Sequence, residues 1–314
     1  MAFDVCRRVR CSGDAPSVQR QPPSSRAAKL VLMIVGLDFG ITNLDGATLE
    51  RGQFGRGWRL SCPGASLESL ELALKTGEIR VSDLSAIGTT GGKHRELPDE
   101  WRGVPLVKVG EAAAVGRGGL ALAGFKEALV VSAGTGTAMY SARGGTFAHV
   151  TGSAVGGGTL LGLSKFLLGT ADPLEVAALA AQGDPARVDG TLQDVLGGGI
   201  GHLPFDATAV NLGRLATLET LPRREDLAAG LVTLVAQVIS VIALNAAQAH
   251  GLERIVFIGH LMDLGPIRAA VKRVWGFYGV TQPPIIPDSS GYATALGAAL
   301  EAQRVLEEVG NLPS

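Results

Sequence analysis

The sequence predicts an α/β fold built from two similar halves. Two stretches, residues 34 to 49 and residues 128 to 150, share one pattern, in which an apolar strand enters a Gly/Thr turn and a further strand leaves it. The stretches lie roughly 95 residues apart, and strand and helix signals follow each of them, as in a duplicated α/β unit. We therefore expect the two turns to face each other across a cleft.

The other elements follow from local sequence patterns. Apolar residues at helical spacing predict helices, and short apolar runs that end at Gly predict buried strands. The last segment, "DSSGYATALGAALEAQRVLEEV", continues from a Gly/Ser start into Ala and Leu at helical spacing, so it predicts a closely packed helix. The predicted elements outside the two repeats are helices near residues 66 to 75, from Gly156 onward and from about 265 to 275, and strands near 86 to 88 and 255 to 258.

Length and charge narrow the class of protein. The chain has 314 residues, enough for one large or two medium domains, and 46% of them are apolar. Charged residues make up 18% and the formal net charge is -1, which gives no electrostatic reason to expect nucleic acid or an anionic membrane as partner. The three cysteines lack metal-ligand spacing, so a reducing cytoplasm is the simpler interpretation of Cys6, Cys11 and Cys62.

Residues 1 to 32 differ in composition from the rest of the chain. They are rich in Arg and Ser, and they contain no apolar core long enough for a secretory signal. A transit peptide is one interpretation; a start placed too far upstream is the other, because Met33 stands immediately before the first strand. We expect a disordered extension at 1 to 32, a first domain at 33 to 127, and a second at 128 to 314 whose last helix can pack back on the first.

One stretch is long and apolar enough to cross a membrane. Residues 227 to 249 contain no charged side chain. Four uncharged polar residues recur there at helical spacing and form one stripe, namely Thr233, Gln237, Ser240 and Gln248. This pattern favours a buried central helix, which could also form a subunit interface, over a membrane span.

Four strand ends carry Gly and Thr. A Gly/Thr turn after a buried strand can direct several backbone N–H groups and hydroxyls at one point, which suits an anion. One such turn can equally be an ordinary Gly-rich hairpin, but four in a duplicated α/β chain favour a nucleotide cleft. The turns are residues 38 to 42, 89 to 92, 134 to 137 and 156 to 158, and the last precedes a predicted helix whose N-terminal amides can add to a phosphate site.

At this level of detail the chain resembles a known family. The motifs "GLDFGIT", "TTGG", "SAGTGTAMY", "GSAVGGGTLLGLSKFLLG", "AAQGD…VD", "ATAVNLGRL", "IVFIGH" and "GYATALGAAL" occur in the order seen in the type II (eukaryotic-like) pantothenate kinases, over residues 34 to 300. The resemblance implies duplicated actin/hexokinase-like (ribonuclease H-like) domains with an ATP cleft between them. It also implies transfer of phosphate from ATP, with Mg²⁺, to pantothenate, which begins coenzyme A biosynthesis. A homodimer and an acyl-CoA feedback ligand follow from the resemblance alone.

The resemblance assigns roles to individual residues. Asp38 would organise Mg²⁺, directly or through water. The residues implied around the phosphates and the nucleotide are Gly40, Thr42, Gly134, Thr135, Gly136, Thr137, Gly156, Gly157, Gly158, Gly259, Gly291 and Ala295. The residues implied on the substrate side are His149, Thr90, Gly91, Gly92 and Asn211.

The resemblance also implies a catalytic base. A carboxylate must accept the proton of the acceptor hydroxyl. In the family this is a Glu seven residues ahead of a Gly, a spacing matched by Glu111 and Gly118. Two other interpretations remain: Glu111 is a solvated Glu favoured by the helix dipole, or a shifted register puts Val109 at the base position.

Several positions depart from the family pattern. The second Gly of the first loop is Ile41, the Lys position is Asp45, the Asp after the base is Ala113, and an Arg position is His149. An anion in place of a cation beside a triphosphate weakens electrostatic complementarity, and His is charged only part of the time near neutral pH. Two further interpretations therefore stay open: a kinase of a different small hydroxyl compound, or a catalytically impaired relative that still binds nucleotide or acyl-CoA. A generic sugar kinase fits the middle motifs less well.

Overall fold

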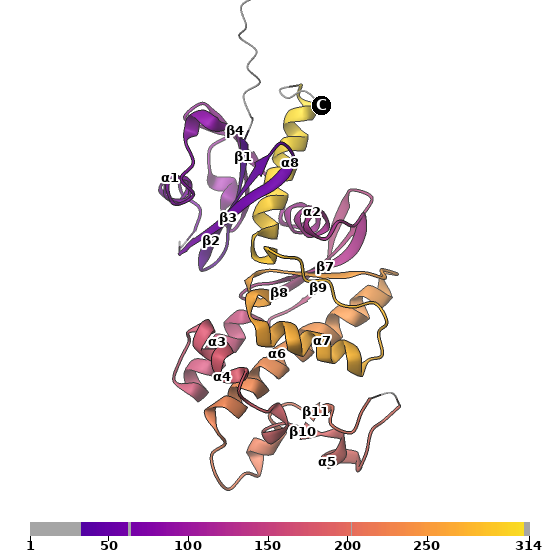
Figure 1. Ribbon diagram of the computed structural model, residues 1–314. Coiled ribbons are helices and arrows are strands. Elements are labelled where there is room, and N and C mark those ends of the chain that lie inside the picture. The colour runs from indigo at the N-terminus through magenta and orange to yellow at the C-terminus, as the bar shows by residue number, and fades with distance from the viewer. Residues whose placement is uncertain (1–32, 62–63, 202, 311–314) are drawn as a thin grey trace, which may run out of the picture. The chain divides into compact units, whose positions relative to one another are not determined.

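Two separate sheets form the framework of the protein (Figure 1). The computed structural model describes residues 33 to 310 except 62–63 and 202, and these residues belong to one compact unit. The first sheet has the order β3-β2-β1-β4-β6-β5 and the second has the order β12-β7-β8-β9. Their strands are β1 (Met33–Phe39), β2 (Asn43–Glu50), β3 (Gln53–Ser61), β4 (Leu84–Gly91), β5 (Glu100–Trp101), β6 (Val104–Lys108), β7 (Glu127–Ala133), β8 (Thr137–Arg143), β9 (Thr146–Ser153) and β12 (Ile255–Ile258).

The two sheets share one topology. In the first, β1, β2 and β3 form an antiparallel meander and β4 pairs with β1 in parallel. In the second, β7, β8 and β9 form the same meander and β12 pairs with β7 in parallel. The predicted duplication is therefore present in the fold, and it begins at β1 and again at β7.

Each helix that the sequence patterns predict is present, and α4 (Pro173–Ala180) and α5 (Leu192–Leu196) are additional. The predicted helix near residues 66 to 75 is α1, which Ser66 caps by accepting a hydrogen bond from the Ser69 amide. The helices are α1 (Leu67–Thr76), α2 (Glu111–Ala123), α3 (Gly157–Leu168), α4 (Pro173–Ala180), α5 (Leu192–Leu196), α6 (Arg224–Ala249), α7 (Gly265–Phe277) and α8 (Ala293–Glu308). A small pair of strands, β10 (Gly190–Thr191) and β11 (Thr208–Val210), lies beside α5, and short 3₁₀ turns include η3 (Pro185–Arg187), η5 (His260–Asp263) and η6 (Ser290–Tyr292).

Small residues let α8 approach both α2 and the first sheet (Figure 1). A Cβ at Gly118 of α2 would lie 1.8 Å from the Ala293 carbonyl oxygen, and one at Gly297 of α8 would lie 1.8 Å from the Ala114 carbonyl oxygen. Within the sheet, a Cβ at Gly36 would lie 1.7 Å from the carbonyl oxygen of Ala295. These distances leave no room for a side chain, so glycine sets how closely the last helix packs.

Helix α6 is the long apolar helix that the sequence predicts at 227 to 249. By length and composition it could cross a membrane, but 61% of its most apolar window is buried inside the protein. Residues such as Val235, Ile239 and Ala243 lie in the main hydrophobic core with α7 and β12. Helix α6 is therefore a core helix of this fold.

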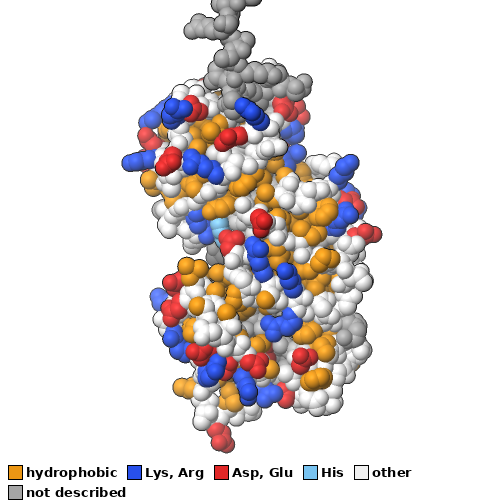
Figure 2. Space-filling model, in the orientation of Figure 1, with side chains coloured by type: hydrophobic (Ala, Val, Ile, Leu, Met, Phe, Trp, Pro, Cys, Tyr) orange, Lys and Arg blue, Asp and Glu red, His pale blue; other side chains and the backbone are white. Residues whose placement is uncertain are grey.

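Some expectations lie outside the described residues. They are those for residues 1 to 32 and for the three cysteines. On the face shown in Figure 2, acidic and basic side chains are interspersed rather than separated by sign, in keeping with the net charge of -1.

Candidate functional site

A row of polar side chains crosses the first sheet at the end of β1. Thr90 of β4 pairs with Asp38 of β1, Asp38 pairs with Asp45 of β2, and Asp45 pairs with Arg59 of β3. Residues directly opposite one another on neighbouring strands share a face of the sheet, so these four side chains lie on one face. The row ends beside the exposed turn that holds Gly40 and Thr42.

Asp38 is the acid of this row whose pKa is raised. Its side chain keeps some contact with solvent, yet burial, followed by the negative charges of Asp45 and Glu111, raises its pKa to about 7. Arg59 and His260 act in the opposite direction but do not compensate. A carboxyl held in this way is poised to receive a cation.

Asp45 is a paired anion. Its Oδ1 accepts a hydrogen bond from Arg59 Nε at 2.9 Å, and its Oδ2 accepts one from Arg59 Nη2 at 3.3 Å. The same Oδ1 lies 3.1 Å from His260 Nε2, while His260 Nδ1 lies 2.6 Å from Asp263 Oδ2. Burial alone would lower the pKa of His260, but its bonds to Asp263 and Asp45 outweigh burial and raise it. Asp45, which stands where the family pattern has a Lys, thus has two basic neighbours, Arg59 and His260.

Glu111 connects to Asp38 and to His149. It stands at the first turn of α2, exposed, and its Oε1 accepts a hydrogen bond from the Tyr140 hydroxyl at 3.0 Å. The Tyr140 ring meets the His149 ring edge to face, with centroids 5.4 Å apart. Burial, followed by the charge of Glu111 and its hydrogen bond, raises the pKa of Tyr140, and Asp38 contributes to the same shift. Val109, the alternative base position, is buried in an apolar cluster.

Hydrogen bonds join the turn at residues 134 to 137 to the start of α3. The Gly157 and Gly158 amides donate to the carbonyl oxygens of Gly134 and Thr135, each at 2.8 Å. A Cβ at Gly156 would lie 2.7 Å from the Thr135 oxygen. The amides of Gly157 and Gly158 are thus occupied in this conformation, whereas the sequence analysis expected them to face a phosphate. Thr137 is also engaged, through Oγ1 donating to the Val155 carbonyl at 2.9 Å.

Two glycines predicted on the nucleotide side, Gly259 and Gly291, let η5 pack closely against η6. Gly259 has a φ of 98°, its amide donates to the Ser290 carbonyl at 2.9 Å, and a Cβ there would lie 2.3 Å from the Ala133 oxygen. A Cβ at Gly291 would lie 2.3 Å from the His260 ring. Ala295 is fully buried against β1, so it serves helix packing.

The turns at the ends of β1 and β4 touch each other. The Gly92 amide donates to the Phe39 carbonyl at 2.8 Å, and a Cβ at Gly91 would lie 2.7 Å from Asp38 Oδ1. Thr90 is buried, and its Oγ1 has no hydrogen-bond partner among the described residues. The structure therefore brings Thr90, Gly91 and Gly92 to Asp38, and the substrate-side role that the resemblance implies for them stays a prediction.

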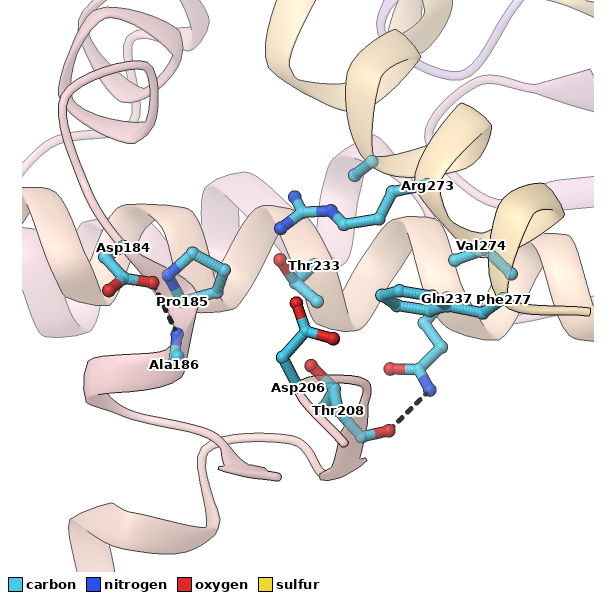
Figure 3. Close-up of a pocket in the computed structure, with 11 residues that line it drawn as sticks. Asp184, Pro185, Ala186, Asp206, Thr208, Thr233, Gln237, Arg273, Val274 and Phe277 are labelled. Carbon is cyan, nitrogen blue, oxygen red and sulfur yellow. Dashed lines mark hydrogen bonds between the residues drawn. The ribbon is translucent and has the colours of Figure 1, made fainter. Parts of the chain in front are cut away.

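Asn211 lies beside a different cavity. Its Nδ2 donates to Gln237 Oε1 at 3.0 Å, and Gln237 Nε2 donates to the Thr208 carbonyl at 3.2 Å. Gln237 and Thr208 line a cavity of about 100 Å³ between α6 and α7, into which Arg273 and Thr233 also point (Figure 3). The contacts of Asn211 thus tie it to this cavity, and the substrate-side role that the resemblance implies for it stays a prediction.

Sequence reasoning missed four residues of the site: Arg59, Tyr140, His260 and Asp263. His260 follows Gly259 in the quoted motif "IVFIGH", so its position was visible. The contact of Arg59 depends on the register between β2 and β3, which includes an irregularity between Ala47 and Leu49. No local pattern reveals that register.

Comparison with known proteins identifies a family and relatives of similar sequence. The model of the family described as Fumble matches residues 127–301. A "Type II pantothenate kinase" from Bacillus cereus (strain G9842) is 28% identical over 177 residues, which are 56% of this chain and 64% of that relative. The match thus spans less than two thirds of the relative's length.

Solved structures show the same fold. The activator of the 2-hydroxyisocaproyl-CoA dehydratase from Clostridium difficile, with bound ADPNP, has a TM-score of 0.63 at 19% identity and covers 90% of this chain and 99% of its own. A ROK family glucokinase from Streptomyces griseus, in complex with glucose and AMPPNP, has a TM-score of 0.57 at 13% identity and covers 87% and 99%. The predicted actin/hexokinase-like fold is confirmed. Since the family match covers more than half of its 314 residues, the chain belongs to the Fumble family.

Proposed function

We propose that this protein is an ATP-dependent kinase of a small hydroxyl compound, pantothenate or a close analogue. The observation that carries the proposal is the convergence of Asp38 and Glu111, which come from different elements, with the charge of Glu111 contributing to the raised pKa of Asp38. Tyr140 links Glu111 to His149, because its hydroxyl donates to Glu111 and its ring contacts the His149 ring. The name of the Bacillus cereus relative supports the substrate class.

Asp38 would hold Mg²⁺. Its carboxylate oxygens are the hard ligands that Mg²⁺ prefers. Burial and then the surrounding negative charge raise its pKa, so a bound cation would relieve the repulsion. Among the described residues, no group of three His, Cys, Asp or Glu side chains could hold a metal by itself. Phosphate oxygens and water would then complete the coordination, as is usual for Mg²⁺ in phosphotransferases.

Glu111 would act as the base. Its carboxylate would take the proton of the acceptor hydroxyl while that oxygen bonds to the γ-phosphorus of ATP and the bond to the ADP oxygen breaks. Tyr140 fixes one oxygen of Glu111 by donating to it, which leaves the other oxygen for the acceptor. His149, beside the Tyr140 ring, and buried Thr90 would contact the acceptor.

Cellular setting and assembly are part of the same proposal. We expect a cytoplasmic homodimer with α6 at the interface and an acyl-CoA feedback ligand. Val238 and Ile242 of α6 are only partly buried within one chain. Val238→Lys or Ile242→Lys should therefore yield monomers in light scattering, and an unchanged mass would contradict the interface.

A second function fits two observations. Asp45 puts an anion near the phosphate turn, and the Gly157 and Gly158 amides are occupied. A catalytically impaired relative that binds nucleotide or acyl-CoA without turnover would tolerate both features. Its signature would be clear ADP binding with no phosphorylation of any pantothenate-like alcohol.

A coupled ADP-release assay separates the two functions. The kinase should release ADP in the presence of pantothenate or a close analogue, and Glu111→Ala should lower kcat by about a hundredfold or more because the base is lost. Glu68→Ala is the matched control, because Glu68 also lies in an exposed first helical turn, that of α1. Equal rates for wild type and Glu111→Ala would overturn the role of Glu111.

A further inference from the structure

The negative charge around Asp38 poses a problem for a nucleotide. Asp38, Asp45 and Glu111 lie close enough that the latter two raise the pKa of the first. A nucleoside diphosphate or triphosphate brings several more negative charges to the same place. Mg²⁺ can offset part of this repulsion, but phosphoryl-transfer sites also use basic side chains on the phosphates.

Two basic side chains act on this acidic cluster, Arg59 and His260. They come from different parts of the chain and meet at Asp45. They differ in whether any of their hydrogen-bond donors remain free to bind a ligand.

Both ring nitrogens of His260 are engaged. Nε2 faces Asp45 at 3.1 Å and Nδ1 faces Asp263 at 2.6 Å, and the ring meets Tyr292 edge to face at 5.1 Å. A histidine has no third nitrogen to offer. His260 therefore fixes Asp45 in place and has no donor to spare for a phosphate.

Arg59 has N–H donors that its hydrogen bonds to Asp45 do not use. It bonds to Asp45 through Nε and Nη2, and Nη1 has no partner among the described residues. A guanidinium carries five N–H donors, so several remain. Its side chain is 38% exposed, whereas that of Asp45 is 12% exposed, so a fixed anion anchors a cation that still reaches solvent.

We propose that Arg59, held in place by Asp45, binds the terminal phosphates of a nucleoside diphosphate or triphosphate. This proposal rests on the proposed function, because it places the nucleotide at the end of β1. Arg59 supplies a positive charge at this edge of the sheet, and Arg suits phosphate because its planar fork bonds two oxygens at once. Asp45 is then the support of a cation, and its presence near the phosphate turn is compatible with nucleotide binding.

Isothermal titration of the full chain with Mg·ADP, and separately with adenosine, tests the proposal. Arg59→Gln should weaken ADP binding by about tenfold or more, since hydrogen bonds to charged groups contribute of the order of 1.5–3 kcal/mol. Adenosine, which lacks phosphate, should bind both proteins equally. Arg59→Lys should lie between them, and Arg80→Gln, an exposed arginine paired with Asp83, should match wild type.

Salt provides a second measurement. A lost phosphate contact should make ADP affinity less dependent on ionic strength in Arg59→Gln than in wild type. ADP affinity within about twofold of wild type would overturn the role of Arg59 and leave the proposed function standing. Equal losses for ADP and adenosine would show that Arg59 only supports the structure, and this too overturns the proposal. Absence of ADP binding by wild type would overturn the nucleotide site itself.

Discussion

The Tyr140 hydroxyl donates to Glu111 Oε1 across 3.0 Å, so a strand of the second sheet orients the first residue of α2. Tyr140 is 4% exposed and its ring is fixed against His149. A buried and packed donor gives Glu111 one preferred rotamer although the carboxylate itself is exposed. Such a contact would hold an exposed helix-start Glu in the fixed orientation that the proposed role of Glu111 as a base requires.

Removal of this hydroxyl should impair turnover more than nucleotide binding. Tyr140→Phe keeps the ring and its packing but leaves Glu111 without its donor, so kcat should fall by about tenfold while KM for ATP changes by less than about twofold. Coupled ADP release measures both. Tyr278→Phe, at a 39% exposed tyrosine outside the site, should behave as wild type. Equal kcat for Tyr140→Phe and wild type would show that Glu111 does not need this contact.

Asp38 should make the protein less stable as pH rises. Its pKa is raised from 3.8 to about 7, so the folded state holds the proton more tightly than the unfolded state and loses stability between these two pH values. The cost at full ionisation is at most about 4 kcal/mol. Asp38→Asn, which carries no charge, should be more stable than wild type in urea unfolding at pH 8, and by less than half that margin at pH 5.

A control identifies the source of this pH effect. Asp206 is exposed at the rim of the α6–α7 cavity, so Asp206→Asn should unfold like wild type at both pH values. A gain in stability from Asp38→Asn that is the same at pH 5 and pH 8 would point to packing rather than to charge.

The metal should reverse the cost of the Asp38 charge. At the proposed site Mg²⁺ would bind the folded state, so Mg²⁺ with ADP should raise the Tm of wild type above the value with ADP alone, and a chelator should remove the increase. Asp38→Asn should lose most of the Mg²⁺-dependent part, because an amide is a weaker ligand than a carboxylate. Asp206→Asn should keep it. The same Mg²⁺-dependent increase in Asp38→Asn would place the metal elsewhere.

The sequence was informative wherever local chemistry determines structure. Strand, Gly turn and strand recur at β1 and β7 because each turn needs small residues and each strand is buried, so the duplication was visible without coordinates. The link between Asp38 and the turn at Thr90 to Gly92 was likewise predictable, because parallel strands place their carboxyl ends together.

The missed features depend on tertiary register. Arg59 reaches Asp45 only because β3 pairs with β2 past an irregularity. The first amides of a helix have no partner within the helix, so the sequence alone leaves the amides of Gly157 and Gly158 free to bind a phosphate. In the structure they donate to carbonyls of a turn about twenty residues earlier. Asn211 carried a motif match, yet its partner Gln237 comes from α6, and no local pattern specifies that pairing.

Gly118 should be among the least tolerant positions of the framework. It faces the Ala293 carbonyl of α8, and a Cβ there would lie 1.8 Å from that oxygen, so one helix backbone would have to move. Gly118→Ala should therefore cost about 2–4 kcal/mol of unfolding free energy despite the better helix propensity of alanine. Gly162 of α3 is the matched control, because a Cβ there would meet nothing within 4 Å. Gly162→Ala should stabilise the protein by about 0.5–1 kcal/mol. Urea unfolding measures both changes, and a Gly118→Ala protein as stable as Gly162→Ala would mean that α2 and α8 do not pack through this contact.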